Sequence, residues 1–267
     1  MEYPGRLVLL GKPVSHSLSP TFQNAALRAA KIPLVYEALE VGARDLRPLL
    51  RDLKKISAVG NVTIPHKIAV HDCCDELTDL AARAGAVNTF WFKSGRLHGD
   101  NTDVGGFDAA ARALLGGDLL EARVVLLGSG GGAAAVLAAI EGWTGATVSI
   151  VARSATRADA LAKRFPDVAR IEKSAKRALS DATLVVNATP VGQREDEQPI
   201  EISMISRSTA VMDLVYRKGG TAWVKAARAR GNRAADGLTM LLEQGALSFQ
   251  RWFGVEPDRE AMRQSLL

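Results

Sequence analysis

Short runs of consecutive apolar residues alternate along this chain with longer segments in which apolar residues recur every three or four positions. The short runs are typical of strands that are buried on both faces, and the longer segments are typical of amphipathic helices. This alternation predicts an α/β fold. The predicted strands cover residues 6–11, 35–41, 59–64, 86–92, a hairpin partner at 97–99, 124–127, 147–151, 184–186 and 210–214.

Capping residues predict where several helices begin and end. Ser19 followed by Pro20 is typical of an N-cap and a first helical position, so a helix is predicted from there to about residue 30. Gly85 is expected to end a helix over residues 75–84. Further helices are predicted over residues 43–55, 105–115, 157–165, 221–230 and 238–253.

A glycine-rich turn follows the apolar strand at 124–127. Its sequence, Gly128-Ser129-Gly130-Gly131-Gly132-Ala133, leads into a run of small residues that is predicted to be helical. In a dinucleotide-binding turn the first glycine permits the tight turn, the second lets the backbone approach a pyrophosphate, and a small third residue packs helix against strand. The helix start then offers N–H donors to the phosphates. We therefore expect a dinucleotide here, although any tight strand-to-helix turn also favours glycine.

The strand that follows this turn ends without an acidic residue. An NAD site usually has an aspartate or glutamate here for the ribose 2′-hydroxyl, but this chain has Ala152, Arg153, Ser154 and Arg157. Two arginines four residues apart can clamp a 2′-phosphate. The alternative is that both are ordinary surface residues. We interpret them as a preference for NADP over NAD.

Polar residues gather where strands in the first hundred residues end. Ser17 and Ser19 are two hydroxyls that can bind a polyol, and capping of the first helix is the structural alternative for Ser19 but not for Ser17. Thr63 and Lys67 lie where a predicted strand ends and are suited to line a cleft. Asn88 lies inside an apolar strand, where its amide needs a hydrogen-bond partner.

Composition restricts the class of protein. The 267 residues can form one large domain or two smaller ones, and the formal net charge of +5 is spread over the whole chain. A nucleic-acid-binding protein would carry a basic patch, so nucleic acid is not expected as a partner. Cys73 and Cys74 are adjacent, which suits neither a disulfide framework nor a metal site. With no signal-like or membrane-spanning segment in the sequence, we expect a cytoplasmic protein without a metal or a membrane partner.

Seven motifs, taken in order, resemble those of the shikimate dehydrogenase family, and the resemblance extends from Gly11 to Gly254. The motifs are His16-Ser17-x-Ser19-Pro20, Asn61-Val62-Thr63-x-Pro65-x-Lys67, Gly85-Ala86-Val87-Asn88-Thr89, Asn101-Thr102-Asp103, Asn187-Ala188-Thr189-Pro190-x-Gly192, Asp213-x-Val215-Tyr216 and Glu243-Gln244-Gly245. The resemblance implies a split substrate domain, residues 1–103 with 238–267, and a Rossmann-type NADP-binding domain of residues 104–237 between its two parts. It also implies reversible reduction of 3-dehydroshikimate to shikimate, a step of chorismate and aromatic amino-acid biosynthesis.

The resemblance further implies roles for single residues. Lys67 would transfer the proton and would be paired with Asp103. The residues expected to hold the hydroxyls and the carboxylate of the substrate are Ser17, Ser19, Thr63, Asn88, Asp103, Tyr216 and Gln244. The residues expected at the cofactor are Asp79, Gly128, Ser129, Gly130, Gly131, Gly132, Arg153, Ser154, Arg157, Thr189, Leu214 and Gly237.

Three residues depart from the usual pattern of the family. Ala152 and Ala134 replace an asparagine and an arginine, and Gln193 replaces a methionine that commonly lies close to the nicotinamide. These changes concern the cofactor rather than the substrate, and they indicate a divergent branch. The first alternative is a dehydrogenase for a related ring, such as quinate or aminoshikimate, and the residue that faces the variable hydroxyl decides between them. A non-catalytic NADP-binding sensor is disfavoured because Lys67 and Asp103 are both present. A small-molecule substrate and a monomer or homodimer are expected.

Overall fold

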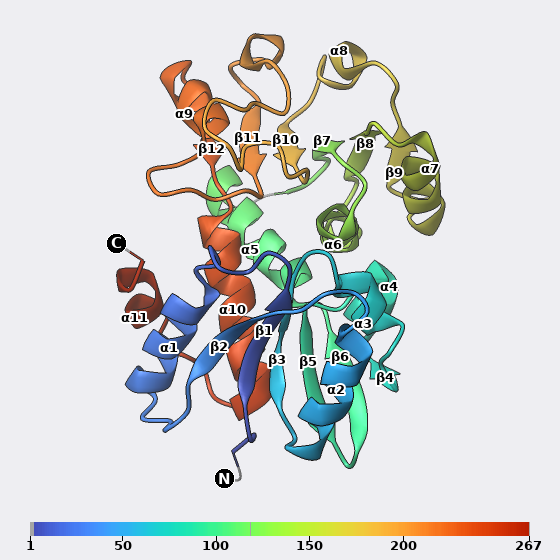
Figure 1. Ribbon diagram of the computed structural model, residues 1–267. Helices are drawn as coiled ribbons and strands as arrows, with labels where there is room; N and C mark the ends of the chain where they lie inside the picture. Colours follow the sequence, from blue (N-terminus) through green and yellow to red (C-terminus); the bar gives the residue numbers. More distant parts are fainter. Residues whose placement is uncertain (1–2, 118, 267) are drawn as a thin grey trace. The chain divides into compact units, whose positions relative to one another are not determined.

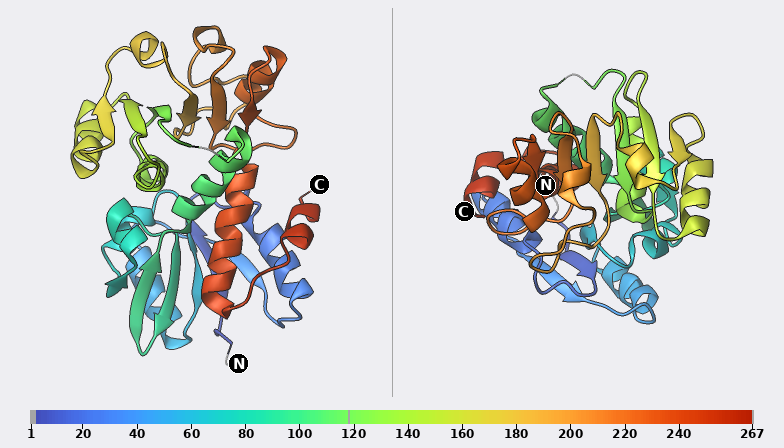
Figure 2. Two further views of the ribbon diagram at one scale, coloured as in Figure 1. Left: turned by 180° about the vertical axis from the view of Figure 1, so that it is seen from behind. Right: turned by 90° about the horizontal axis from the view of Figure 1, so that it is seen from above.

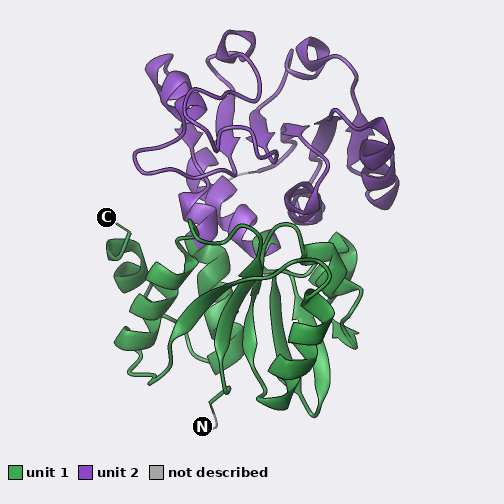
Figure 3. Ribbon diagram, in the orientation of Figure 1, with its two compact units in different colours: residues 1–103, 242–267 green, residues 104–241 purple. Residues whose placement is uncertain are grey.

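The computed structural model describes residues 3–117 and 119–266, which form two compact units. Unit 1 consists of Met1–Asp103 and Leu242–Leu267, and unit 2 of Val104–Leu241 (Figure 3). Helices α5 (Thr102–Leu115) and α10 (Leu238–Phe253) each contribute residues to both units. The chain therefore leaves unit 1 through one helix and returns to it through another.

Within the described part of unit 1, a mixed sheet has the strand order β2-β1-β3-β5-β6-β4. Strands β1 and β3 pair in parallel, whereas β5 pairs antiparallel with both β3 and β6. The strands are β1 (Leu7–Gly11), β2 (Tyr36–Glu40), β3 (Val59–Val62), β4 (Glu76–Leu77), β5 (Thr89–Lys93) and β6 (Arg96–Asp100). All residues of β1 are buried, as its continuous apolar character predicts, and all residues of β3 are buried too, including the polar Asn61.

Helices cover both faces of this sheet (Figures 1 and 2). One face packs against α2, α3 and α4, and its apolar core includes Val8, Leu10, Leu50, Val70 and Phe90. The other face is covered by α1 and α10, and α11 packs on α1. The helices are α1 (Ser19–Ala29), α2 (Leu46–Lys55), α3 (Lys67–His71), α4 (Asp79–Ala84) and α11 (Arg259–Gln264).

Within residues 119–241 of unit 2, every strand pair is parallel and the strand order is β12-β11-β10-β7-β8-β9. The strands are β7 (Arg123–Leu127), β8 (Thr147–Val151), β9 (Ala169–Ile171), β10 (Leu184–Asn187), β11 (Ala210–Asp213) and β12 (Ala234–Ala235). This is the strand order of doubly wound dinucleotide-binding domains. Strands β8 and β9 are added on one side of β7, and β10, β11 and β12 are added on its other side. The predicted α/β fold class is confirmed.

The helices of unit 2 fill the crossovers between these parallel strands. Trp223 of α9 and Ala178 of α8 share an apolar core with Val125, Val185 and Val211 of the sheet. The helical segments are α6 (Gly131–Ile140), α7 (Ala155–Arg164), α8 (Ala175–Ala178), the 3₁₀ turn η1 (Ile202–Met204) and α9 (Ala222–Ala229).

Several predicted element boundaries were wrong. The helix predicted from residue 75 begins at Asp79, because Thr78 accepts the Ala81 N–H as its N-cap and residues 76–77 form β4. The helix predicted from residue 105 begins at Thr102, so Asp103 lies in its first turn. Asn88 was expected inside a strand but directly precedes β5.

Candidate functional site

Lys67 and Asp103 form an ion pair in unit 1. Lys67 is the first residue of α3, which follows β3 and Pro65, and Asp103 lies in the first turn of α5. The Lys67 Nζ is 2.5 Å from Asp103 Oδ2, and the two side chains are 19% and 8% exposed. A half-buried pair of this kind keeps the ammonium group in one position, with some of its surface still open to a ligand.

Asn88 connects this ion pair to α10. Its Oδ1 accepts the Thr102 N–H at 2.7 Å, and this bond fixes which way the amide points. Its Nδ2 then donates to Asp103 Oδ1 at 2.9 Å and to Gln244 Oε1 at 3.2 Å. The structure therefore brings together Lys67, Asp103, Asn88 and Gln244, which were predicted from four separate motifs.

Ser17 and Ser19, at the start of α1, have the opposite of their expected local roles. Helix α1 begins at Ser19 itself, and its N-cap residue, Leu18, makes no side-chain cap. Ser17 Oγ accepts the Ser19 N–H at 3.2 Å, so Ser17 supports the helix start. The Ser19 hydroxyl has no hydrogen-bond partner in residues 3–117 and 119–266, although Ser19 is only 6% exposed. The expected capping role of Ser19 is wrong, and so is the expectation that Ser17 has no structural duty.

Thr63 and His66 lie on either side of Pro65, after β3. The Thr63 backbone is fixed by bonds to the Leu10 carbonyl and the His66 N–H, while its hydroxyl makes no bond to any described residue. His66 is buried, and its Nε2 bonds the Val41 carbonyl at 2.7 Å. Thr63 therefore keeps hydrogen-bonding capacity for a ligand, whereas His66 has a structural role.

The glycine turn after β7 has the geometry of an anion cradle. Gly128 has a φ of +114°, and a Cβ there would lie 3.0 Å from the Ala188 carbonyl oxygen. Gly130 is the N-cap of α6, a Cβ there would meet nothing within 4 Å, and the first turn of α6 holds no acidic residue. The open space beside unpaired helix N–H groups fits a diphosphate.

Arg153 and Arg157 are exposed after the next strand, β8. Neither guanidinium has an ion-pair partner in the part of the chain that the structure describes. Ser154, between them, caps α7 by accepting the Arg157 N–H at 3.4 Å. These groups therefore fit a phosphate on a ribose bound beside the β8 end, which is the chemistry that distinguishes NADP from NAD.

The loop after β10 is held by the side chain of Asn187. Its Oδ1 accepts the Thr189 N–H at 3.0 Å and the Thr189 hydroxyl at 2.6 Å, and its Nδ2 donates to Val191 O and Asp213 Oδ1, both at 2.8 Å. Thr189, predicted at the cofactor, thus also has a structural role. The sequence analysis missed Asn187 as the residue that fixes this loop, although its place at a strand end was a signal.

Asp213 ends β11 and lies fully buried. Burial raises its pKa to about 6, although Thr221, Val215 and Asn187 all donate hydrogen bonds to it. Leu214 follows, and a Cβ on Gly237 would lie 2.2 Å from the Leu214 carbonyl oxygen. Gly237 is therefore required for a close backbone approach at this end of the sheet. The remaining predicted residues are Tyr216, partly exposed in unit 2, and Asp79, exposed at the start of α4 in unit 1.

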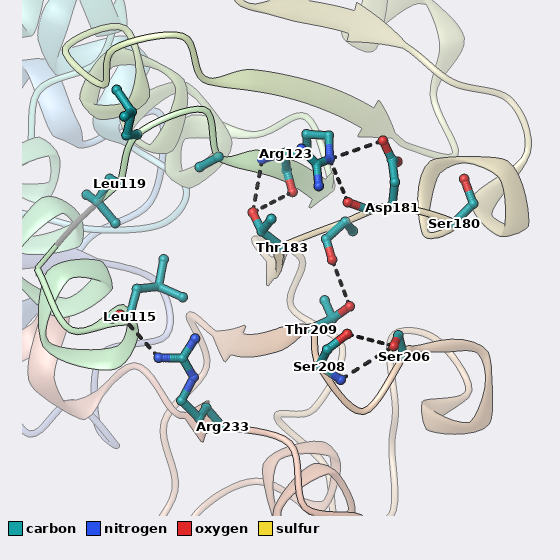
Figure 4. A pocket seen from close by; sticks show the side chains of 13 residues that line it. Leu115, Leu119, Arg123, Ser180, Asp181, Thr183, Ser206, Ser208, Thr209 and Arg233 are labelled. Atoms are coloured by element: carbon teal, nitrogen blue, oxygen red, sulfur yellow. Dashed lines mark hydrogen bonds and ion pairs between the residues drawn. The ribbon is translucent and has the colours of Figure 1, made fainter.

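A cavity of about 420 Å³ in unit 2 holds none of the predicted residues (Figure 4). It lies where β7, β10 and β11 begin, and its lining includes Arg123, Thr183, Thr209 and Arg233. Arg123 Nε is bonded to both the carboxylate and the carbonyl of Asp181, so that cation is already neutralised. Because the cavity lies where these strands begin, it is separate from the glycine turn, which follows the carboxyl end of β7.

Two further findings concern the described residues alone. They hold no group of three or more His, Cys, Asp or Glu side chains that could bind a metal ion. None of their helices combines the length and apolar character needed to cross a membrane.

The strand order and glycine turn of unit 2 define an α/β protein with a Rossmann-type dinucleotide-binding domain. Residues 9–90 match the family model described as the shikimate dehydrogenase substrate binding domain, and residues 237–267 match that of the shikimate 5'-dehydrogenase C-terminal domain. A shikimate dehydrogenase (NADP(+)) of Shouchella clausii is 36% identical over 264 residues, covering 96% of this chain and 95% of its own.

Solved structures agree with these matches. The crystal structure of shikimate dehydrogenase from Aquifex aeolicus has a TM-score of 0.91 and 32% identity, covering 98% of this chain and 97% of that one. A shikimate 5-dehydrogenase from Thermus thermophilus, in complex with NADP(H) and shikimate, has a TM-score of 0.88 and 36% identity, with 98% of both chains covered. The chain belongs to the shikimate dehydrogenase family.

Proposed function

We propose that this protein is an NADP-dependent shikimate dehydrogenase, which reversibly reduces 3-dehydroshikimate to shikimate. The observation that carries the proposal is the Lys67–Asp103 ion pair at 2.5 Å, held by Asn88 in a chain of this family. The reaction needs a group that can give a proton to a developing alkoxide, and a positioned ammonium serves that need.

We assign the substrate to unit 1 and the cofactor to unit 2. The sequence predicted a substrate domain of residues 1–103 and 238–267, and the compact units divide at Asp103 and again between Leu241 and Leu242. Support for this assignment comes from the chemistry of each unit. Unit 1 holds the Lys67–Asp103 pair and the polar groups beside it, and unit 2 holds the glycine turn and the exposed Arg153 and Arg157.

Hydroxyl and amide groups of this chain would hold the ring of the substrate. The Ser19 and Thr63 hydroxyls have unused hydrogen-bonding capacity, and the start of α1 favours an anion, so we place the carboxylate of the substrate near Ser17 and Ser19. Gln244 can donate and accept at ring hydroxyls, and Asn88, which already bonds Thr102, Asp103 and Gln244, would exchange one of its amide bonds for a ring hydroxyl. Tyr216 completes the set as a further hydroxyl group, supported by its place in the motif that follows β11.

NADP would be held at the phosphate cradle and beside β8. Backbone N–H groups from Gly128 to Gly132 would bind the diphosphate, and Arg153, Ser154 and Arg157 would bind the 2′-phosphate. When bound, the nicotinamide supplies the hydride that reduces the ketone carbon. Four further residues are proposed near it: Asp79, Thr189, Leu214 and Gly237.

Lys67 would complete the reduction by moving one proton. As the carbonyl carbon gains a hydride, its oxygen gains negative charge, and the Lys67 ammonium stabilises this oxyanion and then gives it a proton. Asp103 holds the ammonium in place through Oδ2, while Asn88 holds Asp103 through Oδ1. In the reverse direction, neutral Lys67 accepts the proton of the shikimate hydroxyl.

The substitution Lys67→Ala tests this function. We expect it to lower kcat on the order of 10² to 10⁴-fold, with the KM for shikimate within several-fold of the unchanged protein. Lys55→Ala is the matched control, because it removes an exposed lysine that pairs with Asp52 in the same unit. Near-normal kcat with much weaker binding would reassign Lys67 to substrate anchoring. Assaying shikimate, quinate and aminoshikimate, each with NADP and with NAD, tests the substrate and the cofactor.

A further inference from the structure

Three hydroxyl groups from distant parts of the chain form a closed triangle in unit 1. Thr89 of β5, Thr102 of α5 and Ser248 of α10 have their oxygens 2.6 Å (Thr89–Ser248), 3.0 Å (Thr102–Ser248) and 3.1 Å (Thr89–Thr102) apart. Thr89 and Ser248 are 0% exposed. None of the three residues is used in the proton transfer described above.

The triangle is fully connected to its surroundings. Asn61 Nδ2 can donate to Thr89 and to Ser248, both at 2.9 Å, and the Thr102 hydroxyl lies beside the Asn88 amide, 2.9 Å from its Nδ2 and 3.1 Å from its Oδ1. One arrangement of the hydroxyl protons satisfies all three groups. Ser248 donates to the Gln244 carbonyl at 3.0 Å, Thr89 donates to Ser248, and Thr102 donates to Thr89. Each of the three hydroxyl protons then has an acceptor. A buried polar cluster that is satisfied in this way permits only one arrangement of the elements that supply it.

Ser248 and Gln244 lie one helical turn apart on α10. A rotation or shift of α10 that broke the Ser248 bonds would also move the Gln244 side chain away from Asn88 Nδ2, now 3.2 Å from it. Thr102 connects the triangle to the ion pair, because its N–H orients the same Asn88 amide that donates to Asp103.

We propose that Ser248 is a positioning residue, which fixes α10 against β5 and α5 so that Gln244 and Asn88 meet the substrate together. The proposal rests on the proposed function, because it assumes that these two amides bind a ring hydroxyl. Ser248 acts through the triangle and touches no reacting atom.

Ser265 shows how a serine with only a local bond differs. Its hydroxyl donates to the Met262 carbonyl at 2.7 Å in α11 and makes no bond to another element among the described residues. Ser265→Ala therefore removes a comparable helix-to-carbonyl bond without touching the triangle, and it is the matched control.

The experiment compares Ser248→Ala and Ser265→Ala by steady-state kinetics and by calorimetric titration with shikimate and with NADP. Loss of one positioning hydrogen bond corresponds to roughly a fivefold effect, so we expect Ser248→Ala to raise the KM and Kd for shikimate by about that factor. The Kd for NADP should not change, and Ser265→Ala should change neither constant. Thr89→Val, which removes a second hydroxyl of the triangle with little change of shape, should reproduce the effect.

A crystal structure of Ser248→Ala supplies a readout that is independent of activity. We expect the Asn88 Nδ2 to Gln244 Oε1 distance to exceed hydrogen-bond length in the variant. If that distance and the shikimate constants stay unchanged at temperatures where the variant is folded, the positioning role is refuted. An unchanged protein that fails to oxidise shikimate refutes the proposed function instead, while the crystal structure still decides whether Ser248 positions Gln244.

Discussion

The ionisation of Asp213 should lower the free energy of unfolding as the pH rises from about 4 to about 7. Its carboxyl group is fully buried at the end of β11, and burial raises its pKa from 3.8 to about 6. The hydrogen bonds from Thr221, Val215 and Asn187 act in the opposite direction but do not cancel the effect of burial. The nearby charge of Asp236 raises the pKa further.

The direction follows from proton binding in the two states. An unfolded chain loses the Asp213 proton near pH 3.8, whereas the folded protein keeps it until about pH 6. Between these values the folded state binds more protons, so the free energy of unfolding falls as the pH rises. The difference between the two pKa values corresponds to about 3 kcal/mol, which is fully present at low pH and lost above about pH 6.

Asp213→Asn removes the charge and keeps the shape. Its Oδ1 can still accept from Asn187 and Val215, and its new amide faces the Thr221 hydroxyl, which can accept. Measured against the unchanged protein, the variant should gain about 2 kcal/mol of unfolding free energy between pH 4 and pH 7. Urea unfolding followed by circular dichroism at half-unit pH intervals gives this difference.

Asp52→Asn is the control for this measurement. Asp52 is exposed, and the hydrogen bond from Lys55 lowers its pKa, so any pH-dependent difference should be small and of opposite sign. A difference between Asp213→Asn and the unchanged protein that stays flat from pH 4 to pH 7 would refute the argument. That result would mean that the three donors keep Asp213 charged in the folded state.

Three further predictions concern cofactor, substrate and packing. Arg153→Ala should raise the KM for NADP far more than that for NAD in steady-state assays, and equal effects on both would contradict the 2′-phosphate clamp. Ser19→Ala should raise the Kd for shikimate, measured by calorimetric titration, but not the Kd for an analogue without the carboxylate. Ser17→Ala should lower the free energy of unfolding by about 0.5–2 kcal/mol, because it removes the acceptor of the Ser19 N–H. Gly245→Ala should lower the free energy of unfolding in urea by about 1–3 kcal/mol, because the new Cβ would lie 2.3 Å from a ring carbon of buried Phe22; an unchanged midpoint would show that the ring can move aside.

The features that the sequence predicted best depend on local patterns. Strands β1, β7 and β8 appear where apolar runs predicted them, and Gly85 ends α4 with a φ of 60°. The short strands β4, β9 and β12 were not predicted, because two or three residues at a sheet edge carry no readable periodicity. Their pairing depends on the neighbouring strand, which is a tertiary effect.

The polar network around the ion pair could be predicted only in part. Local patterns drew attention to Lys67 and Asn88, whereas Asp103 and Gln244 were selected only by resemblance to a family, which also supplied the role of each of the four. Asn61 and Ser248 were not selected as functional residues. They are joined by a hydrogen bond of 2.9 Å but lie 187 residues apart in the sequence. A polar residue in a strand or helix signals that it needs a partner, but it does not indicate where in the chain that partner lies.

The fold leaves different amounts of hydrogen-bonding capacity to the residues predicted as ligand contacts. Ser17 and Thr189 were both predicted as ligand contacts, yet each already bonds to its own loop or helix start. The hydroxyls of Ser19 and Thr63 have no partner in the part of the chain that the structure describes. Ser19 is 6% exposed, but its oxygen is not closed off from solvent, so a ligand can supply the partner that the described residues do not. We therefore expect Ser19 to contribute more than Ser17 to substrate affinity, which reverses the order of importance that the helix-capping pattern suggested.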